Sequence, residues 1–396
     1  MGLFVLSLSI LKGLRAPNLW AANHYVLNYS EGLIRRGLFG TIGLMLFGDV
    51  FYKYRTLFVI AFGIMALWLI YLLLQSYKVS AKNSPFQMCI LVFFASPAMV
   101  FFVHEVGFFD QFGFLVTIGF IFHCRTLKHN LLAVIIGLSG SLLAFVHEGL
   151  VFIYLPVMLL ALVCQGYSDE TAAPPSRRYK ILLLISCLPA IISLILLAGK
   201  GPISSSQLER LVAQIGPHID FGIRLDIFHI LQRSGGNDLL LMLHSWTRAS
   251  SWVELLVDLL ILSPSLTFLI YYGIIFVNSI KKKINKPAIK IAFIISSLSP
   301  LSLNLLGWDT HRWDALVVVT TYSSLLVLLT YFEAQLTPEQ TTRIVFLAIP
   351  VIFLGLSSEY FLCDDDHFKL YPFLDHLYYL SDVLGGRIKF PTFPTQ

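Results

Sequence analysis

Residues 56–75 read TLFVIAFGIMALWLIYLLLQ, an uninterrupted apolar stretch without a single charged residue. A helix of about 20 residues covers about 30 Å, which is the thickness of the hydrocarbon core of a bilayer. The rest of the 396-residue chain has the same character, since 57% of its residues are hydrophobic and only 13% are charged. A water-soluble fold would carry roughly a quarter charged residues. This composition excludes a water-soluble enzyme, a disordered tail protein and a nucleic-acid binder, and it predicts an all-α polytopic membrane protein.

Hydropathy predicts about ten or eleven transmembrane helices. Residues 1–20 are the weakest candidate because Lys12, Arg15 and Pro17 interrupt the apolar run, and this segment is a first span, a signal-anchor or an interfacial helix. The stretch 38–48 is too short and glycine-rich for a span, so we expect a re-entrant or juxtamembrane helix in the first outer loop. The other expected spans are 56–75, 86–103, 111–124, 131–146, 149–166, 180–198, 253–278, 291–306, 315–332 and 344–360.

Basic residues occupy alternate connections between the expected spans. The positive-inside rule places these connections on the cytoplasmic side, and the other connections then face outward. The basic groups are Lys78 and Lys82; Arg125 and Lys128; Arg177, Arg178 and Lys180; and Lys281, Lys282, Lys283, Lys286 and Lys290. The outward segments are 21–55, 104–110, 147–148, 199–252, 307–314 and the tail 361–396.

The acidic, histidine and arginine residues that interrupt apolar sequence fall in the outward segments. Ionisable groups at membrane depth are costly, so they usually pair with each other or line a wet cavity. We therefore expect them to form one site on the outer face. They are Glu31, Arg35 and Arg36; His104, Glu105 and Asp110; His147 and Glu148; and Asp309, His311, Arg312 and Asp314.

The first of these groups lies in NYSEGLIRRGLFG, residues 28–40. Arginine binds phosphate oxygens with two parallel bonds, and glycine lets a backbone approach a ligand closely. The pattern indicates a pocket for a lipid phosphate at Arg35 and Arg36, with Glu31 as the nearby acid or base. The alternative is an arginine pair that reaches the lipid headgroups, with Glu31 as its ion-pair partner.

The second and third groups share the sequence FVHE, which occurs at 102–105 and again at 145–148. Each copy lies at the outer end of an expected span. A histidine beside a carboxylate can perform acid–base chemistry, bind a divalent ion or form a structural pair. The two copies together with Asp110 favour a functional site over structural pairing.

The fourth group is GWDTHRWD, residues 307–314. Tryptophans at a membrane interface are ordinary belt residues, and Asp309 and Arg312 have the spacing of an ion pair on a helix surface. Sugar sites also combine aromatic and acidic residues, because rings stack on sugar faces and carboxylates accept bonds from hydroxyls. Trp308, Asp309, His311 and Arg312 are therefore candidate sugar-binding residues.

Two further segments have weaker signals. Asp364, Asp365, Asp366 and His367 could ligate a divalent cation through oxygen ligands, or they are a solvated charge run. The loop 199–252 contains amphipathic pieces around 205–215 and 222–232, with a hinge at the Ser-Gly-Gly-Asn of 234–237. We expect this loop to form a cover over the outer site.

The layout of residues 1–252 resembles the GT-C superfamily of integral-membrane glycosyltransferases. Members of this superfamily carry a catalytic acid in the first outer loop, further acids in the second outer loop and a long outer loop after span seven. Glu31, then Glu105 and Asp110, and then the loop 199–252 occupy these places when 1–20 counts as a span. The chain also resembles the small polytopic proteins of bacterial polysaccharide loci, including repeat-unit polymerases of the Wzy or EpsG type.

The resemblance implies a GT-C-like catalytic module over 1–252, which includes the outer loops 21–55 and 199–252, then C-terminal transmembrane helices over 253–360 and an extracytoplasmic tail. The donor would be a sugar on a polyprenyl phosphate or diphosphate, and the acceptor a glycan or a lipid-linked molecule. The reaction would belong to cell-surface polysaccharide biosynthesis on the outer face of a bacterial cytoplasmic (inner) membrane. The catalytic residues would be Glu31, Glu105 and Asp110, and the substrate-binding residues Arg35, Arg36, His104, His147, Glu148, Trp308, Asp309, His311 and Arg312.

The alternative function is a transporter or flippase for a lipid-linked or acidic solute, with the His/Glu pairs as proton relays. A transporter should also have ionisable residues near mid-span and in the inner half, whereas the expected spans are nearly bare of charge there. This distribution favours an enzyme at the outer interface. A membrane acyltransferase is a third possibility, although it gives the two adjacent arginines no role.

Overall fold

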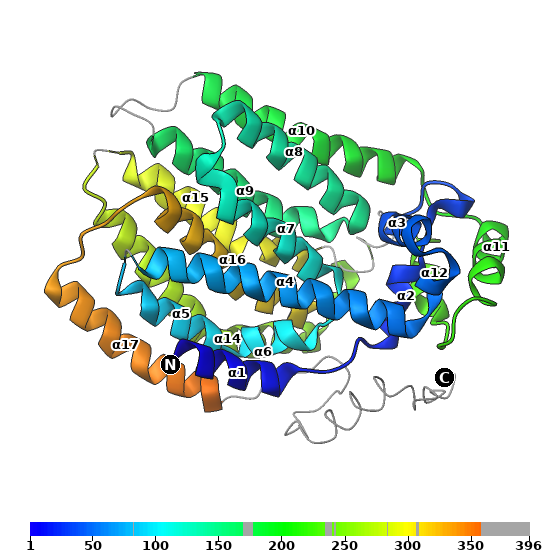
Figure 1. The fold of residues 1–396 in the computed structure, drawn as a ribbon, viewed down its shortest axis with the longest axis horizontal. Coiled ribbons are helices and arrows are strands. Elements are labelled where there is room, and N and C mark those ends of the chain that lie inside the picture. Colours follow the sequence, from blue (N-terminus) through cyan, green and yellow to red (C-terminus); the bar gives the residue numbers. More distant parts are fainter. Residues whose placement is uncertain are drawn as a thin grey trace.

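The structure is a computed structural model, and it describes residues 1–81, 83–168, 177–233, 240, 243–282, 284–305 and 309–357. Across these residues the chain is helical, apart from a single antiparallel bridge between Ile280 and Ala334. The long helices lie side by side in one bundle (Figure 1). Both the N-terminal and the C-terminal parts of the chain contribute side chains to the same hydrophobic core.

The helices centred within the segments 21–55 and 199–252, which are expected from the sequence to face outward, are short. They are α2 (Leu19–Val26), η1 (Tyr29–Glu31), α3 (Gly37–Phe47), η2 (Gly48–Tyr52), α11 (Ser205–Ile215) and α12 (Leu225–Ile230). The helices of the bundle are α1 (Gly2–Gly13), α4 (Tyr54–Ser80), α5 (Phe86–Ala95), α6 (Pro97–His104), α7 (Phe109–His123), η3 (Cys124–Thr126), α8 (His129–Val146), α9 (Gly149–Ser168), α10 (Arg177–Gly199), α14 (Ala249–Asn278), α15 (Lys286–Leu298), η4 (Ser299–Leu305), α16 (Thr310–Tyr331) and α17 (Pro338–Ser357).

The prediction of an all-α polytopic membrane protein is confirmed. Eight helices of the described residues are long and apolar enough to cross a bilayer, or nine if α5 and α6 form one span. The count from hydropathy is higher because it includes α7 and the uncertain segment 1–20. Helix α7 has 15 residues and α1 has 12, fewer than the roughly 20 that a straight span needs. Helix α7 is sheltered by its packing between α4 and α9.

The expected span 86–103 is broken in the structure. Helices α5 and α6 meet at an angle of 55°, either as a bent span or as a re-entrant pair. Ser96 is extended at the break and its hydroxyl accepts a hydrogen bond from the Met99 amide, while Pro97 occupies the first turn of α6. Proline has no N–H to continue the preceding helix, and serine is a favoured cap, so these two residues start a new helix.

Helix α16 is the central element of the bundle. Every residue of its membrane-length window is buried, and it packs against α4, α5, α6, α9, α14 and α15. The Tyr322 ring stacks on Phe93 with the ring centroids 4.1 Å apart. The hydroxyls of Thr320, Thr321 and Ser323 donate to backbone carbonyls of their own helix, so polar side chains are tolerated in this core. The central position fixes the first turn of α16 at one end of the bundle.

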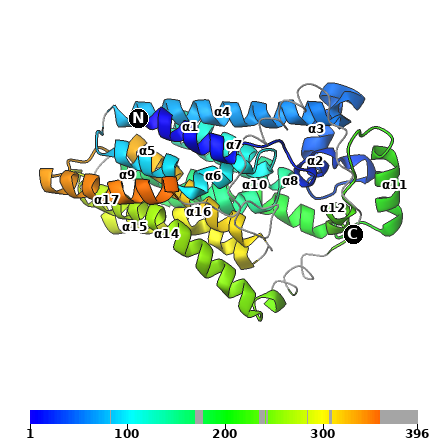
Figure 2. The same ribbon diagram turned by 90° about the horizontal axis from the view of Figure 1, so that it is seen from below.

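Helices α2, α3, α11 and α12 gather at that same end, on the right of Figures 1 and 2. Helix α3 confirms the short helix expected at 38–48, and α11 and α12 confirm helices in the two amphipathic pieces of the long loop. Asn23 of α2 holds this loop, since its amide donates to the Gly222 carbonyl and its oxygen accepts from the Arg224 amide.

Basic residues lie at the opposite end of the bundle. Lys78 lies over the Phe122 ring at 4.8 Å, and Lys282 donates to the Ser168 carbonyl. These two basic residues lie at the end of the bundle away from the four short helices. This separation agrees with the alternation on which the positive-inside prediction rests.

Gly40 gives a test of the packing of α3. A Cβ atom at this position would lie 2.0 Å from the Leu27 carbonyl oxygen, so Gly40→Ala must push the helix away. We expect this substitution to lower the free energy of unfolding by about 1–3 kcal/mol, the usual cost of overpacking. Gly63→Ala in α4 is the matched control, because its Cβ meets no atom within 4 Å. Thermal unfolding in detergent compares the two, and equal midpoints would contradict the close packing.

Candidate functional site at the end of the bundle with the short helices

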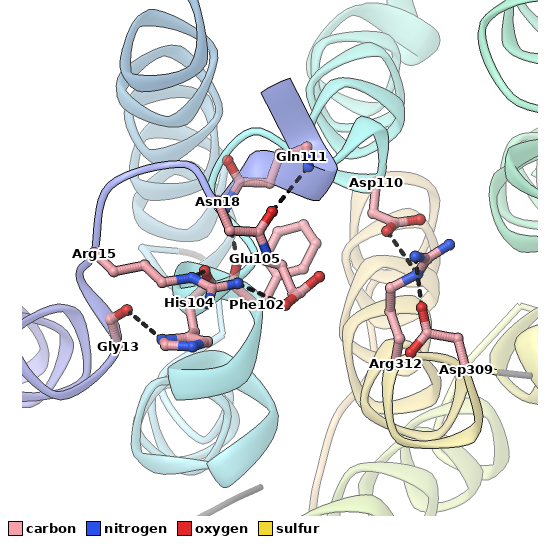
Figure 3. Close-up of polar contacts among 11 residues, drawn as sticks. Gly13, Arg15, Asn18, Phe102, His104, Glu105, Asp110, Gln111, Asp309 and Arg312 are labelled. Carbon is pink, nitrogen blue, oxygen red and sulfur yellow. Dashed lines mark hydrogen bonds and ion pairs between the residues drawn. The ribbon is translucent and has the colours of Figure 1, made fainter. Parts of the chain in front are cut away.

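Arg312 joins two acidic residues from different parts of the chain. Its Nε lies 3.1 Å from the Asp110 Oδ2, and its Nη1 lies 2.7 Å from the Asp309 Oδ2 (Figure 3). The guanidinium is buried, and its carbon lies 4.1 Å from the centre of the Trp313 ring. The backbone of Asp110 is held in place by Tyr154, whose hydroxyl donates to the Asp110 backbone carbonyl. Helices α7, α9 and α16 thus hold a guanidinium between two carboxylates.

A second ion pair joins Arg15 to Glu105, with 3.4 Å between Nη2 and Oε1 (Figure 3). Arg15 also donates from Nε to the His104 carbonyl, and the His104 Nδ1 donates to the Gly13 carbonyl. Both charged side chains are buried. The sequence reading missed Arg15 as a site residue and counted it only as an interruption of a span. The signal was present, since a charge within an apolar run calls for a partner.

Glu105 follows the last residue of α6, and its pKa differs from that of an ordinary glutamate. Burial raises this pKa from 4.5 to about 8, against the opposing charge of Arg15. Transfer of a carboxylate out of water disfavours its charged form. Burial therefore favours the protonated form of Glu105 in its contact with Arg15, and a protonated carboxyl can donate a hydrogen bond as well as accept one.

This protonation gives a direct spectroscopic prediction. Infrared spectra of the protein should contain a protonated-carboxyl band at pH 7 that disappears with a midpoint of about pH 8 and is missing in Glu105→Gln. Because the folded-state pKa lies above the ordinary value of 4.5, stability due to this group is full below pH 4.5 and is lost as pH rises through about 8. A band absent at every pH above 5 would show that Glu105 is ionised.

Arg36 forms a third set of contacts. Its Nη1 lies 2.9 Å from the His24 Nε2, and its Nη2 lies 3.3 Å from the Glu148 Oε1. The backbone of Arg36 is left-handed, with φ 62°, in the residue that caps α3. This conformation costs a side-chain-bearing residue roughly 1–2 kcal/mol. Strain of this kind is concentrated at functional sites, and here it directs the guanidinium toward α2 and toward the start of α9.

The two histidines beside Arg36 are neutral at pH 7. Burial and then the charge of Arg36 lower the pKa of His24 and of His147, and Arg312 lowers both further. Arg36 donates to the His24 Nε2, so the proton of His24 is on Nδ1. The Gly149 amide donates to the His147 Nδ1, so the proton of His147 is on Nε2. The His24 ring lies 6.2 Å from the Phe109 ring, and Arg312 lies over the neighbouring Phe108 ring at 5.5 Å, so the Arg36 and Arg312 contacts are close together.

Glu148 is the ionised acid of this site. Burial alone raises its pKa, but the adjacent Arg36 guanidinium and the other local charges hold it below the ordinary value. Arg35 is one of those charges. The Glu148 side chain is 30% exposed and that of Arg36 is 13% exposed. The Glu148 Oε1 faces Arg36, and its Oε2 is buried without a hydrogen-bond partner among the described residues. Oε2 can therefore accept a hydrogen bond from a hydroxyl bound beside it.

His311 and Asp314 contact groups that the sequence reading did not select. The His311 Nδ1 lies 2.5 Å from the Oδ2 of Asp258, which belongs to α14. The Asn304 amide donates to the Asp314 Oδ1 at 2.8 Å. Asp258 lay inside a run expected to span the membrane, and an acid at that depth was the signal for a partner.

Glu31 lies in a different contact from the other predicted acids. Its carboxylate Oε2 accepts from Arg210 of α11, 2.9 Å from Nε and 2.8 Å from Nη2. The Gln207 side chain donates to the Glu31 carbonyl at 3.3 Å. Glu31 thus joins the first outer loop to the helix of the long loop. Its predicted catalytic role stays a prediction.

The structure therefore brings most of the predicted residues to one end of the bundle. Arg36 contacts His24 and Glu148, and Arg312 contacts Asp110 and Asp309. His147, which directly precedes Glu148, accepts from the Gly149 amide. Trp308, the hinge at 234–237 and the candidate cation ligands Asp364, Asp365, Asp366 and His367 lie outside the described residues. Within the described part of the chain, no group of three or more histidine, cysteine or acidic side chains could hold a metal ion.

In comparisons with known proteins, no family model, no curated protein and no solved structure matches this chain. The resemblance to GT-C enzymes and to polysaccharide polymerases therefore rests on the layout of the sequence alone.

Proposed function

We propose that the protein is a membrane glycosyltransferase. It transfers a sugar or oligosaccharide from a polyprenyl-phosphate or -diphosphate donor to a glycan or lipid-linked acceptor on the extracytoplasmic face. The observation that carries this proposal is the pair of guanidiniums, Arg36 and Arg312, at the same end of a membrane bundle as two neutral histidines and several carboxylates.

The guanidiniums fit the phosphate of such a donor. When the bond between the sugar and the phosphate breaks, its electron pair stays on the phosphate oxygen, and preorganised positive groups lower the energy of that charge. Arginine suits this task because its planar fork matches phosphate oxygens and it stays protonated. The Nε–H of neutral His147 can add one more donor.

The acids fit the hydroxyls of the sugar and of the acceptor. The Glu148 Oε2 is buried and has no hydrogen-bond partner among the described residues, so a hydroxyl bound beside it would supply the missing donor. The Asp309 side chain is 36% exposed, so it can accept a hydrogen bond from a bound hydroxyl while it remains paired with Arg312. Neutral Glu105 can donate one. A carboxylate and a carboxylic acid in one site bind hydroxyls of opposite orientation.

The distribution of charge supports an enzyme over a transporter. In the described residues, the middle parts of α4, α9 and α16 carry no charged side chain. Asp258 is a buried acid within the span α14, and it pairs with His311 of the first turn of α16. A proton relay through the membrane would need ionisable groups along its path. Chemistry at one interface needs them only there.

A glycan comparison in the source cell tests the proposed function. Cells that lack the protein, complemented with wild type or with Glu148→Gln, are analysed for surface polysaccharide and for lipid-linked sugars in each leaflet. We expect the deletion and the variant to lose mature glycan and to accumulate an outward-facing lipid-linked precursor. A precursor confined to the cytoplasmic leaflet would favour a flippase instead, and unchanged glycan would contradict the proposal.

Glu31 gives a separate prediction, because its carboxylate is held by Arg210. We expect Glu31→Arg and Arg210→Glu each to reduce transfer by detaching α11, and the double charge reversal to restore most of it. A pair that acts only by mutual attraction tolerates exchange of its charges, whereas a catalytic base does not. Sugar transfer measured in the three variants therefore shows whether Glu31 is a structural ion-pair partner or a catalytic base. No recovery in the double variant, with normal insertion, would support the catalytic role of Glu31.

A further inference from the structure

His311 and Asp258 form a buried pair that phosphate binding by Arg36 and Arg312 leaves without a role. The His311 Nδ1 lies 2.5 Å from the Asp258 Oδ2, across 53 residues of sequence. The Asp258 side chain is fully buried, while that of His311 is 28% exposed. Asp258 is thus buried inside the bundle, and His311 is partly exposed at the end where the site lies.

The contact fixes the state of the imidazole. A carboxylate only accepts hydrogen bonds, so the Nδ1 of His311 carries the proton and Nε2 is the nitrogen that can take up another. The second oxygen of Asp258, Oδ1, is buried and has no hydrogen-bond partner among the described residues. The negative charge of Asp258 is therefore offset mainly by His311, and it stabilises the imidazolium that forms on protonation.

The surroundings of His311 are acidic. The acids around the imidazole are Glu254 and Asp258 of α14, Asp309, which caps α16, and Asp314 of α16. His311 also directly precedes Arg312 in the first turn of α16. A base and a phosphate-binding guanidinium thus share one turn of the central helix, with the carboxylate of Asp309 bound to that guanidinium.

We propose that His311 is the general base of the transfer reaction and that Asp258 is its positioning residue; this inference rests on the proposed function. The acceptor hydroxyl oxygen bonds to the anomeric carbon of the donor sugar, and its proton passes to the His311 Nε2. The bond from that carbon to the phosphate oxygen breaks, and its electron pair remains on the phosphate. The proton then leaves His311 for solvent, which completes the turnover.

The test uses full-length protein in lipid nanodiscs and, as donor, the lipid-linked precursor extracted from cells that lack the protein. His311→Gln should lower kcat by about 10²–10⁴-fold with little change in KM, which is the usual contribution of general acid–base catalysis. His229→Gln is the matched control, because His229 is an exposed residue of α12 whose Nδ1 contacts the Gln232 side chain. It should retain the wild-type rate.

Asp258→Asn tests the positioning role through the pH profile. Without the carboxylate charge the imidazole loses protons more readily, so the acid limb of the kcat profile should move to lower pH while the maximum rate falls. Nitrogen NMR of labelled histidines, with His311 assigned from its Gln variant, should show the same downward shift of its titration. These measurements separate a positioning effect from a loss of folded protein.

The possible outcomes distinguish the assignment of His311 as the base from the proposed function. A His311→Gln variant with the wild-type rate and pH profile, alongside an inactive Arg312→Gln variant, overturns the assignment of the base and leaves the proposed function standing. An unshifted acid limb and an unshifted NMR titration in Asp258→Asn overturn the positioning role. Failure of wild-type protein to transfer sugar from the extracted precursor overturns the proposed function and the inference together.

Discussion

Arg312→Gln is expected to abolish sugar transfer and to destabilise the protein. The substitution removes the positive charge between Asp110 and Asp309, and Asp110 is then left as a buried acid without its counter-charge. Removal of one partner from a buried ion pair typically costs about 3–5 kcal/mol. Loss of one donor to a developing anion costs a further 10²–10³-fold in kcat, as a rough guide. Thermal unfolding and transfer from the extracted precursor measure the two effects.

The double variant Arg312→Gln/Asp110→Asn separates these effects. Removal of both buried charges should restore much of the stability, because neither group then lacks a partner. It should not restore transfer, since the guanidinium for the phosphate is still missing. Arg343→Gln is the matched control, because Arg343 belongs to α17 and lies over the Tyr271 ring, outside the site. Transfer regained in the double variant would contradict the role of Arg312 in phosphate binding.

Arg36→Gly is expected to lower kcat by about 10²–10³-fold, the usual cost of losing a donor to a developing anion, while destabilising the protein less than Arg36→Gln does. The guanidinium that contacts His24 and Glu148 is lost. Glycine, however, adopts the left-handed backbone at φ 62° without steric cost. Relief of this strain offsets part of the lost ion pair, so activity and stability should separate at this residue.

Arg36→Gln and Arg224→Gln complete the comparison. Glutamine keeps the backbone strain and also lacks the charge, so Arg36→Gln should be as inactive as the glycine variant but less stable. Arg224 is exposed and pairs with its neighbour Asp226, and its substitution should leave transfer unchanged. Equal stability of the glycine and glutamine variants would show that the left-handed backbone carries no strain, and wild-type kcat in both would remove Arg36 from the site.

The sequence alone determined the class of the fold and the distribution of charge along it. Burial of an apolar run in lipid is a local property of about 20 residues, so the long spans 56–75 and 149–166 could be located without the structure. The same holds for the amphipathic helix at 205–215, whose pattern repeats within a few turns. Hydropathy locates helix breaks less well than it locates spans. The break at Ser96 and Pro97 changes the direction of the chain, but the sequence on both sides of it is equally apolar.

Only the tertiary structure decided which charges pair. Arg15 meets Glu105 across 90 residues, His311 meets Asp258 across 53, and Glu31 meets Arg210 across 179. Each pairing depends on which helices pack together and on how each helix is rotated about its axis. A local sequence pattern predicts neither property. An unpaired charge in a bundle is costly, so the sequence could predict that partners exist. The packing of α1 on α6, of α14 on α16 and of α11 on η1 selected those partners.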